Sequence, residues 1–156
     1  MSNTPGVGKT APDFKAESTA GIIQLSDTKG HKMVLFFYPK DNTPGCTNEA
    51  QAFQEYQQAF TRANCYIAGV SRDSLNSHAK FTDKLGLKYP LIADTDEKVC
   101  QLYDVIRDKK MYGKTVRGIE RSTFLIDENG TIVRAWRGVK VPGHVNEVLD
   151  AVQTLA

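Results

Sequence analysis

Met33-Val-Leu-Phe-Phe-Tyr38 and the segment that follows it, Pro39-Lys-Asp-Asn-Thr43-Pro-Gly-Cys46, decide the fold. The first six residues form a continuous apolar run rich in β-favouring side chains, and Pro39 ends it. Such a run predicts a strand that is buried on both faces at the centre of a sheet. After the polar residues 40–42, Thr43 can cap a helix whose first position is Pro44. The local order is therefore strand, tight turn, helix.

The rest of the chain alternates between predicted strands and helices. The helix after Thr43 should carry a mainly apolar stripe, formed by Ala50, Phe53, Tyr56, Gln57 and Phe60. The other predicted elements are strands at 66–70, 91–93, 123–126 and 132–136 and helices at 74–85, 96–103 and 144–155. The turn sequence Asp127-Glu-Asn-Gly130 joins the last two strands in an antiparallel hairpin. This order indicates an α/β protein with a thioredoxin-like fold, in which helices flank a central mixed β-sheet.

Length and composition fit a single domain that covers residues 1–156. With 156 residues and 40% hydrophobic side chains, the chain can build one ordinary core. The longest apolar run has six residues, whereas a membrane helix needs ~20, and the N-terminus lacks the apolar segment of a signal peptide. Three cysteines without a CxxC pair argue against a disulfide scaffold or a zinc site. We therefore expect a cytoplasmic protein with no metal.

The charge balance argues against an obligate polyanionic partner. The formal net charge is only +2, which is too small to require nucleic acid or an anionic membrane surface. Basic side chains do gather in one stretch, at Arg107, Lys109, Lys110, Lys114 and Arg117. Such a run is typical of a solvated loop. We expect neither nucleic acid nor a membrane as a partner.

Cys46 has the position of a reactive thiol. If Thr43 is the N-cap, Cys46 occupies the third helical position, where unpaired backbone N–H groups and the helix dipole stabilise a thiolate. The Thr43 hydroxyl, the N–H groups of Gly45 and Cys46, and a nearby arginine are suited to stabilise charge during attack on an electrophile. An isolated cysteine more often serves as a small buried hydrophobe. The place of Cys46 after a strand and a capped turn favours the nucleophile.

These residues resemble the PxxxTxxC signature of the peroxiredoxins, as it stands in Pro39-Lys-Asp-Asn-Thr43-Pro-Gly-Cys46. The similarity is greatest to the bacterioferritin comigratory protein branch, also called the Q-type peroxiredoxins. It continues through Gly118-Ile-Glu-Arg121-Ser-Thr-Phe-Leu-Ile-Asp127 to Val139-Lys-Val-Pro-Gly-His144 and so covers nearly the whole chain. The resemblance implies a thiol-dependent peroxidase, without a cofactor, that reduces hydrogen peroxide and organic hydroperoxides.

The resemblance also implies roles for individual residues. Cys46 would be the peroxidatic cysteine, Thr43 would hydrogen-bond the peroxide and the thiolate, and Pro39 would shield the sulfur from bulk solvent. Arg121 would hold the thiolate and polarise the peroxide. Glu49, one turn beyond Cys46, is a candidate for orienting this arginine, although a solvated helix face explains it equally well.

The chain departs from the family pattern at the second, resolving cysteine. Many relatives carry it five residues after the peroxidatic cysteine, where this chain has Gln51, and others carry it in the following helix, where the residues around Thr82 offer none. Cys65 and Cys100 remain, and we expect both to be buried structural residues. We therefore predict a single-cysteine mechanism in a monomer, in which Cys46 cycles through a sulfenic acid and an external thiol restores it. Thioredoxin, glutaredoxin and glutathione are the candidate reductants.

Other functions have weaker support in the sequence. Gly6-Val-Gly-Lys-Thr10 lacks the first glycine and the preceding strand of a phosphate-binding loop. A cysteine hydrolase would pair Cys46 with one of the three histidines, His31, His78 or His144, for which we expect ordinary surface or capping roles. A thioredoxin-type disulfide reductase would need a CxxC pair. A peroxide-sensing redox switch or chaperone-like binding protein, in which Cys46 oxidation alters partner binding, remains the non-enzymatic alternative.

Overall fold

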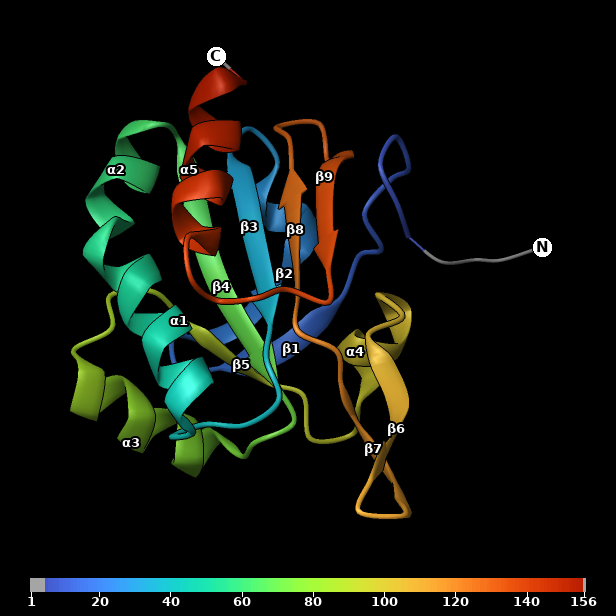
Figure 1. The fold of residues 1–156 in the computed structure, drawn as a ribbon. Helices are drawn as coiled ribbons and strands as arrows, with labels where there is room; N and C mark the ends of the chain where they lie inside the picture. The colour runs from blue at the N-terminus through green and yellow to red at the C-terminus, as the bar shows by residue number, and fades with distance from the viewer. Residues whose placement is uncertain (1–4, 156) are drawn as a thin grey trace.

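A computed structural model describes residues 5–155 and shows a central sheet with helices against it (Figure 1). The elements in chain order are β1 (Lys15–Ser18), β2 (Gly21–Gln24), the 3₁₀ helix η1 (Leu25–Thr28), β3 (Lys32–Phe37), α1 (Pro44–Glu55), α2 (Gln57–Arg62), β4 (Cys65–Ser71), α3 (Leu75–Leu85), β5 (Leu91–Ala93), α4 (Lys98–Leu102), β6 (Ile106–Met111), β7 (Lys114–Ile119), β8 (Ser122–Ile126), β9 (Ile132–Arg137) and α5 (His144–Thr154).

Seven strands form the central sheet in the order β2-β1-β5-β4-β3-β8-β9. The strand predicted from the apolar run, β3, lies inside it, parallel to β4 and antiparallel to β8. All six of its residues are buried, as expected for a strand covered on both faces. The predicted α/β architecture, a mixed sheet flanked by helices, is therefore confirmed.

The sheet separates two hydrophobic cores. Successive side chains of a strand point to opposite faces, so Val34 and Phe36 of β3 enter one core while Leu35 and Phe37 enter the other. The first core lies under α1, α2, α3 and α5, and the second lies against η1, α4 and the segment before β1. Because α1 packs on the first core, its N-terminal end is held at the edge of the sheet where β3 ends.

Most predicted elements agree with the structure, and the differences have local causes. The strand at 91–93 and the hairpin of β8 and β9 are confirmed. The helix predicted at 74–85 is α3: Ser74 caps it by accepting a hydrogen bond from the Ser77 N–H, and Gly86 ends it in the left-handed conformation. The apolar stripe after Cys46 is divided between α1 and α2, which meet at Tyr56. The helix predicted at 96–103 is shorter, because its N-cap Glu97 adopts a left-handed φ of 64°.

The basic stretch is not a loop but a second, two-stranded sheet. β6 and β7 pair antiparallel over six residue pairs, from Ile106 with Ile119 to Met111 with Lys114. Tyr112 and Gly113 form the turn, and both have positive φ. This hairpin extends away from the central sheet (Figure 1). The prediction of a solvated loop is wrong in structure, although most of these side chains do face solvent.

Within residues 5–155 no helix is both long and apolar enough to cross a lipid bilayer.

Candidate active site

The turn from β3 into α1 places Cys46 as the sequence predicts. Thr43 is the N-cap, with an extended backbone at φ −95° and ψ 155°, and Pro44 is the first helical residue, so Cys46 takes the third position. The Thr43 side chain makes no capping hydrogen bond; its hydroxyl instead donates to the Lys40 carbonyl oxygen at 2.8 Å. The expected side-chain cap is therefore wrong. The free N–H groups of the first helical turn therefore receive no hydrogen-bond acceptor from the Thr43 side chain.

Arg121 meets Cys46 from the far end of the sequence. It lies between β7 and β8, 75 residues from Cys46, and its Nη2 donates a hydrogen bond to the Cys46 Sγ at 3.3 Å. The sulfur is almost completely buried, with 1% of Cys46 exposed. The guanidinium therefore brings a positive charge and a hydrogen-bond donor directly against a buried sulfur.

Gly45 allows this approach. A Cβ at position 45 would lie 3.2 Å from the Arg121 Nη2, which is closer than ordinary van der Waals contact. A larger residue would therefore push the guanidinium away from the sulfur.

Glu49 holds the other side of the guanidinium. Arg121 Nη1 donates to Glu49 Oε1 at 2.6 Å, and the Glu49 side chain is fully buried. Its second oxygen, Oε2, is buried without a hydrogen-bond partner among the described residues. Burial raises the pKa of Glu49 to about 7, against the opposing effect of Arg121. Glu49 therefore does not lie on a solvated helix face, and that alternative is wrong. Arg121 bridges the Glu49 carboxyl group and the Cys46 sulfur.

Pro39 stands at the surface directly after β3. It is exposed and lines a cavity together with Lys40, Arg72 and Asp73. The buried residue of this segment is its neighbour Tyr38, which is 1% exposed. Shielding of the sulfur by Pro39 stays a prediction.

Cys65 is buried at the opposite end of the sheet. It is the first residue of β4 and pairs with Lys32, whereas the end of β3 that leads to Cys46 pairs Phe37 with Val70. About 16 Å of strand separate these ends at about 3.3 Å per residue. A disulfide needs Cα atoms within about 7 Å. Burial also raises the pKa of the Cys65 thiol to about 12, so this sulfur stays protonated.

Cys100 is buried on the other face of the sheet. It belongs to the core under α4, whereas Cys46 belongs to the core under α1. Burial, helped by the carboxylate of Asp94, raises the pKa of the Cys100 thiol far above its usual range. The predicted burial of both additional cysteines is confirmed, and all three cysteines are free thiols.

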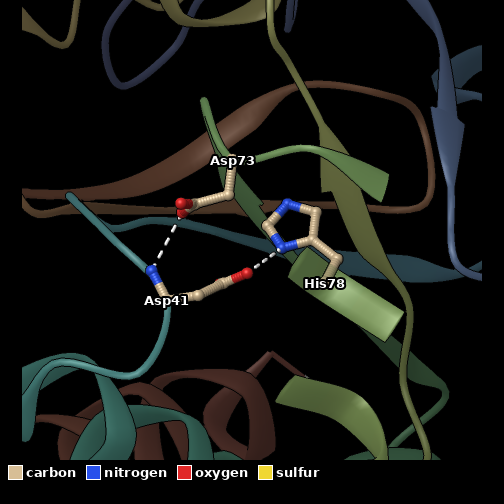
Figure 2. A group of neighbouring side chains, drawn as sticks. All are labelled: Asp41, Asp73 and His78. Carbon is tan, nitrogen blue, oxygen red and sulfur yellow. Dashed lines mark hydrogen bonds and ion pairs between the residues drawn. The ribbon is translucent and has the colours of Figure 1, made fainter. Parts of the chain in front are cut away.

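A buried polar cluster next to this turn was not predicted from the sequence. Asp41, in the turn itself, faces His78 of α3 with 2.7 Å between Oδ2 and Nδ1, and its backbone N–H donates to Asp73 Oδ2 at 2.9 Å (Figure 2). The Tyr38 hydroxyl donates to Asp41 Oδ1 at 2.7 Å and the Ser77 hydroxyl to Oδ2 at 2.8 Å. These bonds tie the turn before Cys46 to the start of α3. Residues 37 positions apart give no local signal of such a contact.

The same cluster is the candidate metal site of the described residues. Asp41, Asp73 and His78 each offer a ligand atom within 4.8 Å of the others. The ligand atoms are already engaged, however: His78 Nδ1 lies 2.7 Å from Asp41 Oδ2, and Asp73 Oδ2 accepts from the Ser71 hydroxyl at 2.6 Å. We interpret the cluster as a hydrogen-bond network that fixes the turn.

The three histidines have partners other than Cys46. His31 contacts Asn64, His78 contacts Asp41, and His144 Nε2 lies 2.8 Å from the Thr123 hydroxyl. The expectation of surface or capping roles is wrong for His78 and His144, because both are buried. Burial lowers the pKa of His144 to about 4. This arrangement gives a Cys–His hydrolase no support.

Comparison with known proteins finds a family model and curated relatives that cover most of this chain. The AhpC/TSA family model matches residues 7–135. Peroxiredoxin Bcp of Xanthomonas campestris is 52% identical over 127 residues, covering 81% of this chain and 79% of the relative. Peroxiredoxin Bcp of Bacillus subtilis is 44% identical over 151 residues, covering 96% of each chain.

Solved structures show the same fold. A cysteine-to-serine mutant of PrxQ from Xylella fastidiosa superposes with a TM-score of 0.92 at 42% identity and covers 97% of each chain. The bacterioferritin comigratory protein of Xanthomonas campestris, studied for its alkyl peroxide reduction activity, gives a TM-score of 0.87 at 46% identity over 91% of each chain. The predicted thioredoxin-like fold is confirmed.

Proposed function

Because the chain belongs to the AhpC/TSA family and to its Bcp or PrxQ branch of peroxiredoxins, it is a thiol peroxidase, and we propose that Cys46 carries out this activity through a single-cysteine cycle. The observation that carries the proposal is the 3.3 Å hydrogen bond from Arg121 to a buried sulfur at the start of a helix. Guanidinium and helix end together supply the positive potential that a thiolate needs.

The first half of the cycle is attack on the peroxide. The Cys46 sulfur forms a bond to one peroxide oxygen while the O–O bond breaks, so that the sulfur becomes a sulfenic acid and the other oxygen leaves as water or an alcohol after taking up a proton. Negative charge grows on the departing oxygen during this step. The Nη2 group of Arg121 carries two hydrogens, so it can donate to that oxygen as well as to the sulfur while Nη1 stays bonded to Glu49.

Thr43 and Gly45 position the peroxide. The Thr43 hydroxyl donates its hydrogen bond to the Lys40 carbonyl oxygen. The hydroxyl oxygen of Thr43 can therefore accept a hydrogen bond from the peroxide O–H. The N–H groups of Gly45 and Cys46 belong to the first helical turn and can donate to a peroxide oxygen. Pro39 limits access of water from the side of the turn. The Glu49 carboxyl group binds the Arg121 guanidinium and so holds it against the Cys46 sulfur.

The second half of the cycle needs a thiol from outside the chain. Gln51 stands where many relatives carry the resolving cysteine, and the residues around Thr82 in the following helix include none. Cys65 and Cys100 lie in other parts of the two cores. An external thiol therefore attacks the sulfenic acid, releases water and forms a mixed disulfide, and a second thiol then frees Cys46. Hydrogen peroxide and alkyl hydroperoxides are the proposed substrates, and a thioredoxin, a glutaredoxin or glutathione is the proposed reductant of a monomeric enzyme.

A doubly substituted chain, Cys65→Ser with Cys100→Ser, tests the cycle. We expect it to consume peroxide at the wild-type rate with dithiothreitol, and to yield one dimedone adduct at Cys46 by mass spectrometry after peroxide treatment. Loss of turnover in this variant, together with an internal disulfide to Cys46 in the wild type, would refute the single-cysteine cycle. Stoichiometric oxidation without turnover would instead favour the redox switch.

A further inference from the structure

The β6–β7 hairpin concentrates positive charge. Residues 106–119 hold five of the 20 Lys and Arg of the chain but one of its 18 Asp and Glu. The rest of the chain therefore has 15 basic and 17 acidic residues and is net negative. A local field of this sign attracts an acidic partner more strongly than the small net charge of +2 suggests.

The charges divide into two groups along the hairpin. At its base, Arg107 pairs with Asp104 at 3.1 Å and Arg117 pairs with Glu97, which also binds Arg72 at 2.9 Å. The hydrogen bonds from Arg117, the largest cause, and from Arg72 lower the pKa of Glu97 to about 2. Nearer the tip, three lysines are exposed and form no ion pair within residues 5–155; they are Lys109, Lys110 and Lys114. The arginines anchor the hairpin, and the lysines remain available.

The tip carries an exposed aromatic side chain. Tyr112 is fully exposed, at 100%, and has φ of 53° in a turn where glycine or asparagine is the usual residue. Val116 of β7 is 45% exposed. A non-glycine residue in this conformation is strained and persists where the surroundings or the function require it. Tyr112 and the exposed lysines belong to the same hairpin, and aromatic side chains are enriched at protein interfaces.

The hairpin is connected directly to the active site. β7 leads through Glu120 into Arg121, whose guanidinium contacts Cys46. Arg72, held by Glu97 at the hairpin base, donates to the Arg117 carbonyl and lines the same cavity as Pro39. In Figure 1 the hairpin and the N-terminal end of α1 lie at the same end of the central sheet. A six-residue strand is about 20 Å long and a protein of about 100 residues has a radius of gyration near 13 Å, so one small partner can cover both.

We propose that the β6–β7 hairpin is the docking surface for the reducing partner, a small thiol protein with an acidic surface around its reactive cysteine. The inference rests on the external-thiol cycle proposed above and names its partner. The lysines steer the acidic protein and Tyr112 contacts it, while its thiol attacks the sulfenic acid of Cys46, releasing water and forming a mixed disulfide. A second cysteine of the partner then attacks its own sulfur in that bond, so the partner leaves as a disulfide and Cys46 as a thiol.

The test compares two variants that lose the same charge. One is Lys109→Gln, Lys110→Gln and Lys114→Gln; the control is Lys15→Gln, Lys29→Gln and Lys88→Gln, exposed positions outside the hairpin. Each is oxidised with one equivalent of peroxide, and the rate of reduction of the sulfenic acid is measured by stopped flow with an acidic thioredoxin. At low ionic strength we expect the hairpin variant to be about tenfold slower than the control. The difference should shrink as salt is added.

Dithiothreitol, which is uncharged, separates this proposal from the catalytic cycle. Both variants should react with it at the wild-type rate, and Tyr112→Ala should raise KM for thioredoxin several-fold without changing the dithiothreitol rate. Equal rates of the two lysine variants with thioredoxin would overturn the docking surface while leaving the cycle intact. Binding to phosphatidylserine vesicles or single-stranded DNA that is lost in the hairpin variant alone, with unchanged thioredoxin rates, would overturn it in favour of a polyanionic partner.

Discussion

Cys46 and Cys65 are buried in the same hydrophobic core, yet their surroundings give them different chemistry. The Cys46 sulfur accepts a hydrogen bond from the Arg121 guanidinium, whereas the Cys65 thiol donates weakly to the Tyr66 carbonyl at 3.4 Å. Cys65 also has a cation nearby, but the Lys32 ammonium donates to the Ala63 carbonyl. A buried thiol without a guanidinium donor, such as Cys65, is therefore inert, whereas the guanidinium aimed at the Cys46 sulfur suits it to react as a nucleophile.

The largest effect should come from removing the reactive sulfur itself. Cys46→Ser replaces the thiolate by a hydroxyl, which is not ionised at neutral pH and cannot cycle through a sulfenic acid. We expect peroxide turnover to fall by at least about 1000-fold, measured as peroxide consumption with dithiothreitol. Residual activity within tenfold of the wild type would place the nucleophile elsewhere.

Replacing Arg121, which donates the hydrogen bond to the Cys46 sulfur, should have the next largest effect. Arg121→Lys keeps the positive charge but cannot reach Glu49 and the Cys46 sulfur at once, because an ammonium lacks the planar fork of the guanidinium. We expect kcat/KM for peroxide to fall about 100-fold. Arg117→Lys, at an exposed ion pair in the hairpin base, is the matched control and should change it less than twofold. Equal losses in both variants would contradict a specific role for Arg121.

Glu49 links stability to pH, and replacing it should have a smaller effect on activity. Its pKa is raised by burial from 4.5 to about 7, so the folded protein binds its proton at a higher pH than the unfolded chain does. The free energy of unfolding should therefore increase as pH falls from 7 to 4.5, by up to about 3 kcal/mol. Glu49→Gln should remove most of this slope in urea unfolding at pH 5 and pH 7.5. It should also lower turnover about tenfold, because Arg121 loses its anchor.

The smallest effect on activity should come from the inert thiols. Cys65→Ala and Cys100→Ala each remove one buried sulfur atom, so we expect a loss of about 1–2 kcal/mol in stability and less than a twofold change in peroxide turnover. Thermal unfolding and the peroxide assay measure the two quantities. An activity loss that exceeds the stability loss would show that one of these cysteines takes part in the reaction.

Local sequence patterns predicted the strands at the centre of the sheet, but not β1, β2 or the β6–β7 hairpin. The apolar run of β3 and the strand Leu91–Ala93 could be predicted because burial on both faces demands continuous hydrophobic side chains. β1 and β2 have mixed, partly exposed sequences of four residues and gave no periodic signal. The β6–β7 hairpin was hidden because its strands carry charge where a half-buried strand would carry apolar residues.

The active site divides in the same way. Cys46 and Thr43 lie in one turn, so spacing alone indicated a cysteine at a helix start. The contact of Arg121 with Cys46 spans 75 residues and was expected only from the family resemblance. The burial of Glu49 could not be predicted, because its neighbours on α1 include exposed residues such as Gln51. The Asp41–His78 contact joins a turn to a helix 37 residues away and left no pattern in the sequence.

The Asp41–His78 contact also gives the enzyme a built-in spectroscopic reporter. The Nε2 of His78 lies 2.9 Å from the Ile92 carbonyl oxygen, and its Nδ1 lies 2.7 Å from Asp41 Oδ2, so both ring nitrogens are held in short hydrogen bonds. The ring is fully buried, and protons held in this way exchange slowly with water. They should therefore give separate resonances at low field in a proton NMR spectrum. Since Asp41 belongs to the turn that carries Cys46, movement of these resonances would follow the oxidation and recovery of the sulfur without any added label.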